Sequence, residues 1–176
     1  MGSALALALL LLAGASGCTP LGRRSAGPVP GADGNRQDPA LSGDGRLLAS
    51  SVDLGGRTTL LLQEQPSGRL LPLPQLQRLQ PHRSPSLSWT GRYLALIGQR
   101  GDQPTPVVLD RLNGRLHWLR LPAGLQPERL SLAPDARRLA VAWIRQGRSE
   151  VQLLDLSGLL EPDLPPGQPV SGGGLP

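Results

Sequence analysis

An eight-residue phrase occurs three times along the chain and constrains its fold more than any other feature. It reads Ser-Gly-Asp-Gly-Arg-Leu-Leu-Ala at residues 42–49, Ser-Trp-Thr-Gly-Arg-Tyr-Leu-Ala at 88–95 and Ala-Pro-Asp-Ala-Arg-Arg-Leu-Ala at 133–140. The copies begin 46 residues apart (42 to 88) and then 45 residues apart (88 to 133). A period of roughly 20–50 residues indicates a repeat architecture, and one of about 40–45 is typical of a propeller blade.

Each copy of this octet joins a turn to an apolar run. Asp44-Gly45 and Thr90-Gly91 are turn pairs because glycine adopts positive φ readily, and Pro134-Asp135 supplies the turn in the third copy. Short apolar runs bounded by turns are typical of strands that are buried on both faces. The copies also share an arginine, which we interpret as a feature of blade edges rather than a binding site: Arg46, Arg92 and Arg137.

The segments between the octets complete four-stranded units. Asn113-Gly114 is the strongest hairpin signal, and the third unit ends in a weak strand at Leu159-Leu160. The sequence therefore predicts an all-β fold of three antiparallel four-stranded propeller blades, a partial propeller. The blade domain covers residues 39–161, with blades at about 39–80, 84–125 and 127–161. Residues 18–38 and 162–176 are rich in Gly and Pro, so we expect a flexible tether and a disordered tail.

The repeat resembles that of TolB-type propellers. Their pattern is a short strand, Ser-Pro-Asp-Gly-Lys/Arg, an apolar strand, and a strand that ends in Asp-Leu-x-Ser/Thr-Gly. Residues 133–140 with 155–158 form the closest copy, and residues 110–114 also fit. The first copy has Gly43 where the family has proline, and the second has Trp89-Thr90 in place of Pro-Asp. The resemblance covers about two thirds of the chain. It implies a propeller fold, which hosts many different activities.

The first 18 residues have the pattern of an export signal. The apolar run from Ala4 to Ala13 is shorter than the roughly 20 residues that a membrane-spanning helix needs. Small residues follow it, directly before Cys18, the only cysteine. This junction resembles a bacterial lipobox, which implies that residues 1–17 are removed as a signal peptide and that Cys18 is lipidated. We therefore expect a lipoprotein at the cell envelope, anchored in a membrane and facing the periplasm. The alternative is an ordinary cleaved signal peptide with an incidental cysteine.

The composition excludes several kinds of site. The chain has no lysine, so a phosphate-binding Gly-x4-Gly-Lys-Ser/Thr loop cannot exist, and it has no Gly-x-Ser-x-Gly nucleophile elbow. His82 and His117 have no neighbouring cysteine or carboxylate cluster that would indicate a metal site. The formal charge of +5 comes from arginine without interleaved stacking aromatics, so we do not expect nucleic-acid binding. We expect no enzyme activity, no cofactor and no bound metal.

Among the tryptophans, Trp89 is the best candidate for contact with a partner, because it lies at the turn of an octet. Trp118 and Trp143 are expected to pack between blades.

The leading hypothesis is a non-enzymatic, envelope-anchored propeller that binds a protein or peptide. The TolB resemblance implies envelope-integrity partners, such as a peptidoglycan-associated lipoprotein. The alternatives are an accessory or degenerate propeller fragment of a hydrolase, and a purely structural lipoprotein.

Three blades leave two apolar faces open, whereas closed propellers have about 4–8 blades. A homodimer that forms a six-bladed ring would cover these faces. An open arc that is capped by its own tails or by a partner would also cover them.

Overall fold

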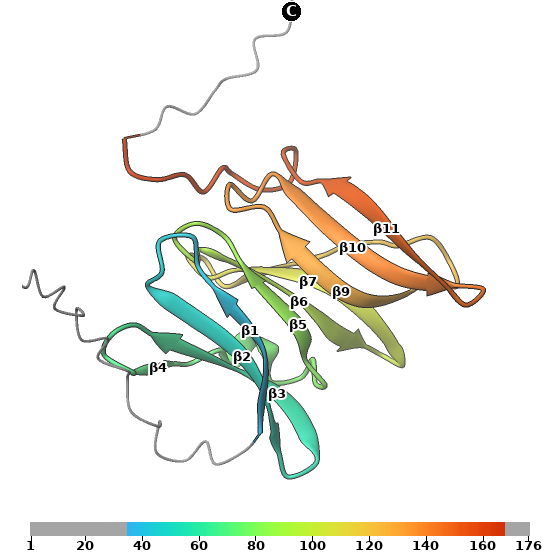
Figure 1. The fold of residues 1–176 in the computed structure, drawn as a ribbon, viewed down its shortest axis with the longest axis horizontal. Helices are drawn as coiled ribbons and strands as arrows, with labels where there is room; N and C mark the ends of the chain where they lie inside the picture. The colour runs from blue at the N-terminus through green and yellow to red at the C-terminus, as the bar shows by residue number, and fades with distance from the viewer. Residues whose placement is uncertain (1–34, 168–176) are drawn as a thin grey trace, which may run out of the picture.

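The computed structural model describes residues 35–167, which form three antiparallel β-sheets arranged as successive blades (Figure 1). The first sheet has the order β1 (Arg36–Leu41), β2 (Leu47–Leu54), β3 (Arg57–Glu64) and β4 (Leu70–Leu71). The second has the order β5 (Arg83–Leu87), β6 (Tyr93–Arg100), β7 (Gln103–Asp110) and β8 (Arg115–Trp118). The third contains β9 (Gln126–Leu132), β10 (Arg138–Arg145) and β11 (Arg148–Asp155). A short 3-10 turn, η1 (Pro74–Leu76), lies in the link between the first two sheets. The predicted all-β class and the three blades are confirmed.

The third blade corrects the prediction, because it has three strands and not four. Leu159 and Leu160 form a turn, in which both backbone N–H groups donate to the carbonyl oxygen of Leu156. Leu160 is buried in the core between the second and third blades, so the chain curls inward at the place where a fourth strand would have to start.

The strand at the outer edge of the first blade is short. It consists of only Leu70–Leu71. Pro72 and Pro74 follow directly, and proline has no N–H group to donate to a neighbouring strand.

Two apolar layers fill the spaces between the blades. Strand β6 separates them, because Leu94 and Leu96 pack toward the first blade while Ala95 and Ile97 pack toward the third. All four side chains are at most 1% exposed. The continuous apolar run of the second octet is thus explained by burial on both faces of the middle blade.

The octets form the predicted turns, and all three turns lie at one end of the strands (Figure 1). The hydroxyl of Ser42 accepts the N–H of Leu47, and that of Ser88 accepts the N–H of Tyr93, each at 2.9 Å. Backbone hydrogen bonds link one turn to the next, since Asp44 N–H donates to the carbonyl of Trp89, and Trp89 N–H donates to that of Pro134. We call this end of the molecule the turn end.

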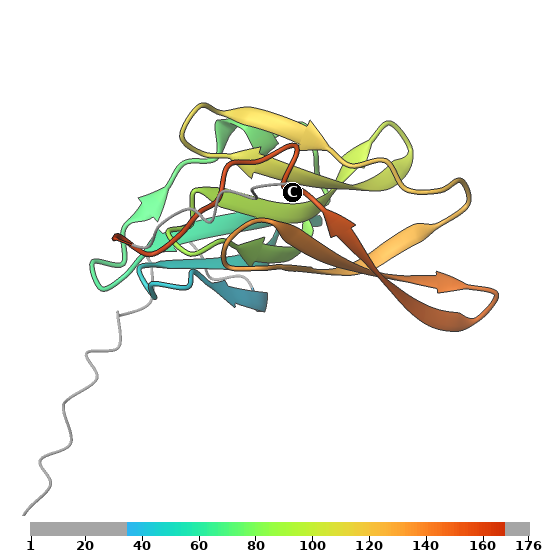
Figure 2. The same cartoon turned by 90° about the horizontal axis from the view of Figure 1, so that it is seen from above.

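After β11 the chain crosses the turn end as a strap, which we define as residues 156–167. It runs from the third blade across the second toward the first, as Figures 1 and 2 both show. Its Asp163 is 6% exposed and contacts the second blade. The sequence predicted a disordered tail from residue 162, so this part of the prediction is corrected for residues 162–167. Residues 168–176 lie outside the described residues.

Candidate functional site

A cleft of about 560 Å³ opens at the turn end between the first and second blades. Five segments line it: the octet turns of both blades, the β3–β4 turn, the β7–β8 turn and the strap. The volume falls within the range of about 300–1,000 Å³ that is typical of ligand sites. We call it the turn-end cleft.

Trp89 forms one wall of the turn-end cleft and rests on Gly43 of the first blade. A Cβ atom at position 43 would lie 2.5 Å from Cε3 of the Trp89 ring, so only glycine fits beneath it. The backbone of Trp89 is hydrogen-bonded on both sides, to Asp44 and to Pro134. Trp89 is only partly buried, so part of this side chain remains exposed at the cleft.

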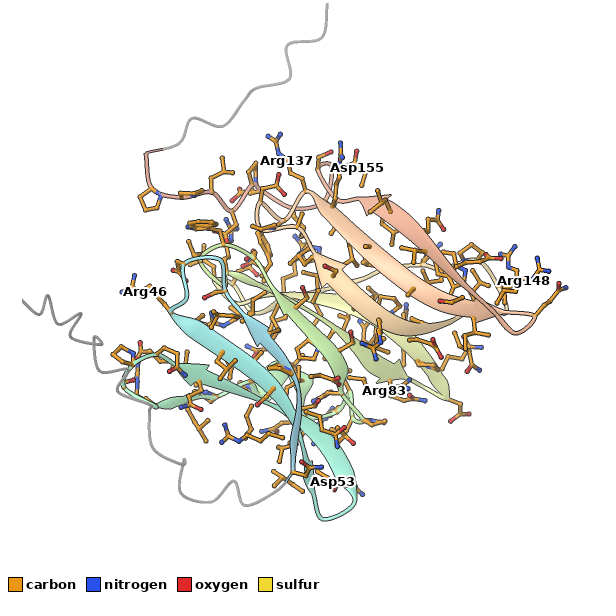
Figure 3. The ribbon with its side chains drawn as sticks, in the orientation of Figure 1. Arg46, Asp53, Arg83, Arg137, Arg148 and Asp155 are labelled. Atoms are coloured by element: carbon orange, nitrogen blue, oxygen red, sulfur yellow. The ribbon has the colours of Figure 1, made fainter. Side chains whose placement is uncertain are left out.

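Three arginines line the cleft together with this ring, and only one of them forms a direct ion pair. Arg69 pairs with Glu64 at 3.3 Å, and this hydrogen-bonded pair lowers the pKa of Glu64. Arg111 donates from Nη1 to the carbonyl of Gly91 at 2.6 Å, and burial lowers the pKa of its guanidinium. Arg46 lies at the tip of its turn (Figure 3) and is exposed. Asp44 and Glu64 also line the cleft, which thus combines an aromatic wall with three arginines and two carboxylates.

A second charged cluster lies beside the cleft, around Arg92. Its guanidinium pairs with Asp110 at 3.0 Å and with Glu161 of the strap at 2.7 Å, and it lies 4.8 Å from the centre of the Tyr93 ring. The hydrogen bond to Asp110 raises the pKa of Arg92. Burial raises the pKa of Asp110, but the hydrogen bond and charge of Arg92, together with hydrogen bonds from the Leu112 N–H and Asn113, outweigh it, and the pKa lies below its ordinary value. This cluster joins the strap to the second blade.

The strap also supplies a carboxylate that the second octet lacks. In the first octet, Ser42 Oγ donates to Asp44 Oδ1 at 2.7 Å. The second octet has Thr90 at the corresponding position, and there Asp163 takes over: Ser88 Oγ donates to its Oδ2 at 2.5 Å. Thr90 donates to the same carboxylate from its N–H at 2.9 Å and from its hydroxyl at 2.8 Å. A residue 75 positions away thus completes the turn of the second blade.

The octet arginines differ in their surroundings, although they share a position in the repeat. Arg92 is held in the cluster beside the cleft, whereas Arg46 lines the cleft itself. Figure 3 shows Arg46 and Arg137 at the turn end, and Asp53, Arg83 and Arg148 at the opposite end of the strands.

The two histidines are not brought together. His82 is 1% exposed, and both of its ring nitrogens are used: Nδ1 accepts the N–H of Leu60 at 3.2 Å, and Nε2 donates to the carbonyl of Leu76 at 2.7 Å. Burial lowers the pKa of His82. His117 is half-buried on β8. Within residues 35–167 no group of three or more His, Cys, Asp or Glu side chains could hold a metal ion.

The other tryptophans lie where packing was expected. Trp143 is 4% exposed in the core between the second and third blades, and its ring N–H donates to Glu150. Trp118 packs against the core between the first two blades and has the Arg100 guanidinium 5.3 Å from its ring centre.

Residues 1–17, which the sequence predicts to be a signal peptide, and Cys18 lie outside the described residues. In the part of the chain that is described, no helix has the length and apolar character needed to cross a membrane.

Sequence reasoning named Trp89 as a candidate contact, interpreted Arg46 as a blade-edge feature, and missed Gly43, Arg111 and the strap. The departure of the first octet from the family pattern, glycine in place of proline, was the available signal for Gly43. Nothing local in the sequence points to the contact between Asp163 and the second octet.

Comparison with known proteins supports the fold. No family model matches the sequence, and no curated protein matches it. Among solved structures, TolB from Acinetobacter baumannii is 17% identical with a TM-score of 0.57, over 72% of this chain and 31% of that one. The β-propeller domain of the Trilobed protease from Pyrococcus furiosus is 14% identical with a TM-score of 0.53, over 74% of this chain and 41% of that one. A nidogen/laminin complex is 13% identical with a TM-score of 0.55, over 71% of this chain and 46% of that one.

The chain spans between about a third and just under half of the length of these structures. At such low identity the similarity shows the fold alone. The predicted TolB-like fold is confirmed: the described residues form three consecutive blades of a β-propeller.

Proposed function

We propose that this chain is a non-enzymatic propeller module that binds a protein partner in the turn-end cleft. The segment it recognises is extended and carries an acidic side chain close to an aromatic or apolar one. The observation that carries this proposal is the partly exposed side chain of Trp89, which rests on Gly43 in a cleft that three arginines also line. Tryptophan and arginine are the side chains most enriched among those that dominate binding energy at protein interfaces.

The turn-end cleft suits this role better than the other hollows of the described surface. A hollow of about 610 Å³ near the β2–β3 turn and one of about 480 Å³ near residues 119–125 are lined without any aromatic side chain. The turn-end cleft also lies where two blades and the strap meet, and pockets occur preferentially at such junctions.

Selection from a library of displayed peptides tests this proposal. Peptides enriched on the full chain with Cys18→Ser should carry Asp or Glu near an aromatic residue. Their affinity should fall at least tenfold in Trp89→Ala and in Arg46→Glu. Arg148→Glu is the matched control, because it makes the same charge change at the opposite end of the strands, and it should leave binding unchanged (Figure 3). Enriched peptides that bind Trp89→Ala as well as the parent chain would exclude the turn-end cleft.

The proposal includes attachment to the bacterial envelope through a lipid on Cys18. Support comes from the sequence alone: the apolar run, the small residues after it and the single cysteine. Stable membrane anchoring normally requires more than one acyl chain, which a lipoprotein modified on both the thiol and the new amine would have. Radiolabelled palmitate should be incorporated into the chain in a bacterial host and should be lost in Cys18→Ser. Incorporation that survives this substitution would place the lipid elsewhere.

A second candidate is a propeller that accompanies a hydrolase. The similarity to the propeller domain of the Trilobed protease favours it. A neighbouring reading frame that encodes a nucleophile elbow would support it, and hydrolysis by the isolated chain of the peptides it binds would contradict the non-enzymatic assignment.

A further inference from the structure

Strand β11 forms a long edge of the third blade that no described strand covers. It pairs with β10 along its entire length, from Arg138 opposite Asp155 to Arg145 opposite Arg148. On its other side no strand follows within residues 35–167, because the chain turns inward after Asp155 (Figure 1). An edge of this kind presents unpaired backbone N–H and C=O groups to its surroundings.

Every other edge strand of the described sheets carries a feature that discourages pairing. The outer edges of the first two blades are short, with two residues in β4 and four in β8. The inner edges, β1, β5 and β9, each contain a proline and an irregular register with the neighbouring strand. Strand β11 has eight residues, no proline and a continuous register. Short strands, prolines and bulges are among the ways in which proteins protect edges, and β11 has none of these three.

The hairpin geometry shows which groups of β11 face outward. Its turn has two residues, Gln146 and Gly147, with positive φ values of 50° and 77°. In such a hairpin the residues that flank the turn form a hydrogen-bonded pair, and hydrogen-bonded pairs then alternate along the ladder. The backbone groups of residues 149, 151, 153 and 155 therefore point away from β10.

The side chains of the same residues lie on the outer face of the third blade. Val151 is 68% exposed and Leu153 is 63% exposed, opposite Ala142 and Ala140 of β10. Ile144 on the same face is 47% exposed. The unpaired edge and the exposed apolar side chains thus belong to the same residues.

We propose that β11 pairs antiparallel with β11 of a second copy of this chain, about a twofold axis at Gln152. A twofold axis between two antiparallel edge strands stands perpendicular to the sheet, so side chains from the same face must lie opposite one another. In the register centred on Gln152, Val151 lies opposite the partner's Leu153, and Ser149 lies opposite the partner's Asp155. Glu150 lies opposite the partner's Leu154, so no like charges meet.

This register is better matched than its neighbours. Apolar cross-strand pairs stabilise a sheet by about 0.2–1 kcal/mol each, and like charges directly opposite destabilise it. The register centred on Val151 would place Ser149 against the partner's Leu153, and the one centred on Leu153 would place Asp155 against the partner's Val151. The register centred on Gln152 instead gives two Val–Leu pairs and two hydrogen-bonding Ser–Asp pairs.

Cysteine crosslinking tests both the dimer and its register, in the full chain with Cys18→Ser. Gln152 would lie opposite its own copy in a non-hydrogen-bonded pair with Cα atoms about 4.5 Å apart, a separation that a disulfide spans. Gln152→Cys should therefore form a covalent dimer under mild oxidation at least tenfold faster than Val151→Cys. Equal crosslinking at the two positions, or faster crosslinking at position 151, would overturn the proposed register.

Light scattering on the uncrosslinked chain tests the association itself. The parent should be dimeric at micromolar concentration, and Leu153→Lys should weaken the dimer at least tenfold because lysine is a typical edge-protecting residue. Leu54→Lys is the matched control: Leu54 is 45% exposed on the first blade and should not affect association. Thermal melting of each variant establishes that it folds. A monomeric parent at about 100 µM, or a dimer that Leu153→Lys leaves intact, would refute the proposal.

Discussion

Replacing Asp163 by alanine removes the carboxylate that fastens the strap to the second blade. Three hydrogen bonds are lost, one from Ser88 Oγ and two from Thr90. Their costs differ because Ser88 is 0% exposed, whereas Thr90 is exposed and its freed groups can bind water. Loss of a hydrogen bond to a charged group costs about 1.5–3 kcal/mol when the remaining partner is buried. It costs about 0.5–1 kcal/mol when the remaining partner is exposed and can bind water instead. We therefore expect Asp163→Ala to lower the free energy of unfolding by about 2.5–5 kcal/mol.

The asparagine variant should be much milder. Its side-chain oxygen can accept from Ser88 and Thr90 N–H, while its NH₂ group donates to the Thr90 hydroxyl, which can accept. A loss of about 1 kcal/mol or less is expected for Asp163→Asn, since no buried group is left without a partner.

Thr90→Asp provides the decisive comparison, because it should destabilise the parent chain but stabilise the Asp163→Ala variant. In Asp163→Ala it restores the local carboxylate that Asp44 supplies in the first octet, and it should recover stability. With Asp163 present, two carboxylates would stand about 4 Å apart, which costs up to about 4 kcal/mol at an effective dielectric constant of 20.

Urea unfolding of the four chains in this cycle measures the coupling directly. The melting temperature should shift with the free energy of unfolding, by about 2–4 °C per kcal/mol for a chain of this length. An effect of Thr90→Asp with the same sign in both backgrounds, or a loss below about 1 kcal/mol in Asp163→Ala, would refute this account.

Three further predictions follow from described contacts. Burial lowers the pKa of His82, so the folded state holds the neutral ring. The stability it contributes is complete above its ordinary pKa of 6.5 and is lost as the pH falls below it. The unfolding free energy should decline by up to about 1.4 kcal/mol per pH unit between pH 7 and 5, and it should decline less in His82→Gln. An equal decline in the two chains would contradict the role of His82. Gly43→Ala should lose about 1–3 kcal/mol in chemical denaturation because its Cβ meets the Trp89 ring, and the loss should largely disappear in Trp89→Ala. Arg92→Met should lose about 2 kcal/mol because it leaves the buried Asp110 carboxylate unpaired. The pKa of Asp110 lies below its ordinary value of 3.8. The parent chain should therefore be more stable than Arg92→Met above pH 3.8, and this difference in unfolding free energy should vanish as the pH falls below that value. Unfolding free energies of both chains, measured over a series of acid pH values, would show this.

The blades could be predicted because their signals are local and repeated. A turn pair, an apolar run and a hairpin pair lie within a few residues of one another, and three copies at nearly equal spacing reinforce the same interpretation. The strap could not be predicted in this way. Leu159-Leu160 has the composition of a short strand, and only the burial of Leu160 against the second blade shows why the chain turns there. The contact between Asp163 and Ser88 joins residues 75 positions apart, and no repeated pattern in the sequence indicates it.

The departures from the repeat pattern carried more information than the matches. Gly43 and Trp89 were two separate exceptions in the sequence, but in the structure they are one packing arrangement, in which the ring occupies the space of the missing side chain. Likewise, Thr90 departs from the repeat pattern, and in the structure Asp163 supplies the carboxylate that the second octet lacks.

The strap has a consequence for how the molecule loses its structure. In a linear array each repeat is stabilised only by its neighbours, so the terminal repeats fray first and unfolding proceeds stepwise. Here the chain after the third blade is fastened to the turn of the second, and Pro166 reaches the cleft beside the first. Fraying of the third repeat therefore has to release contacts on the second, which couples these repeats in unfolding.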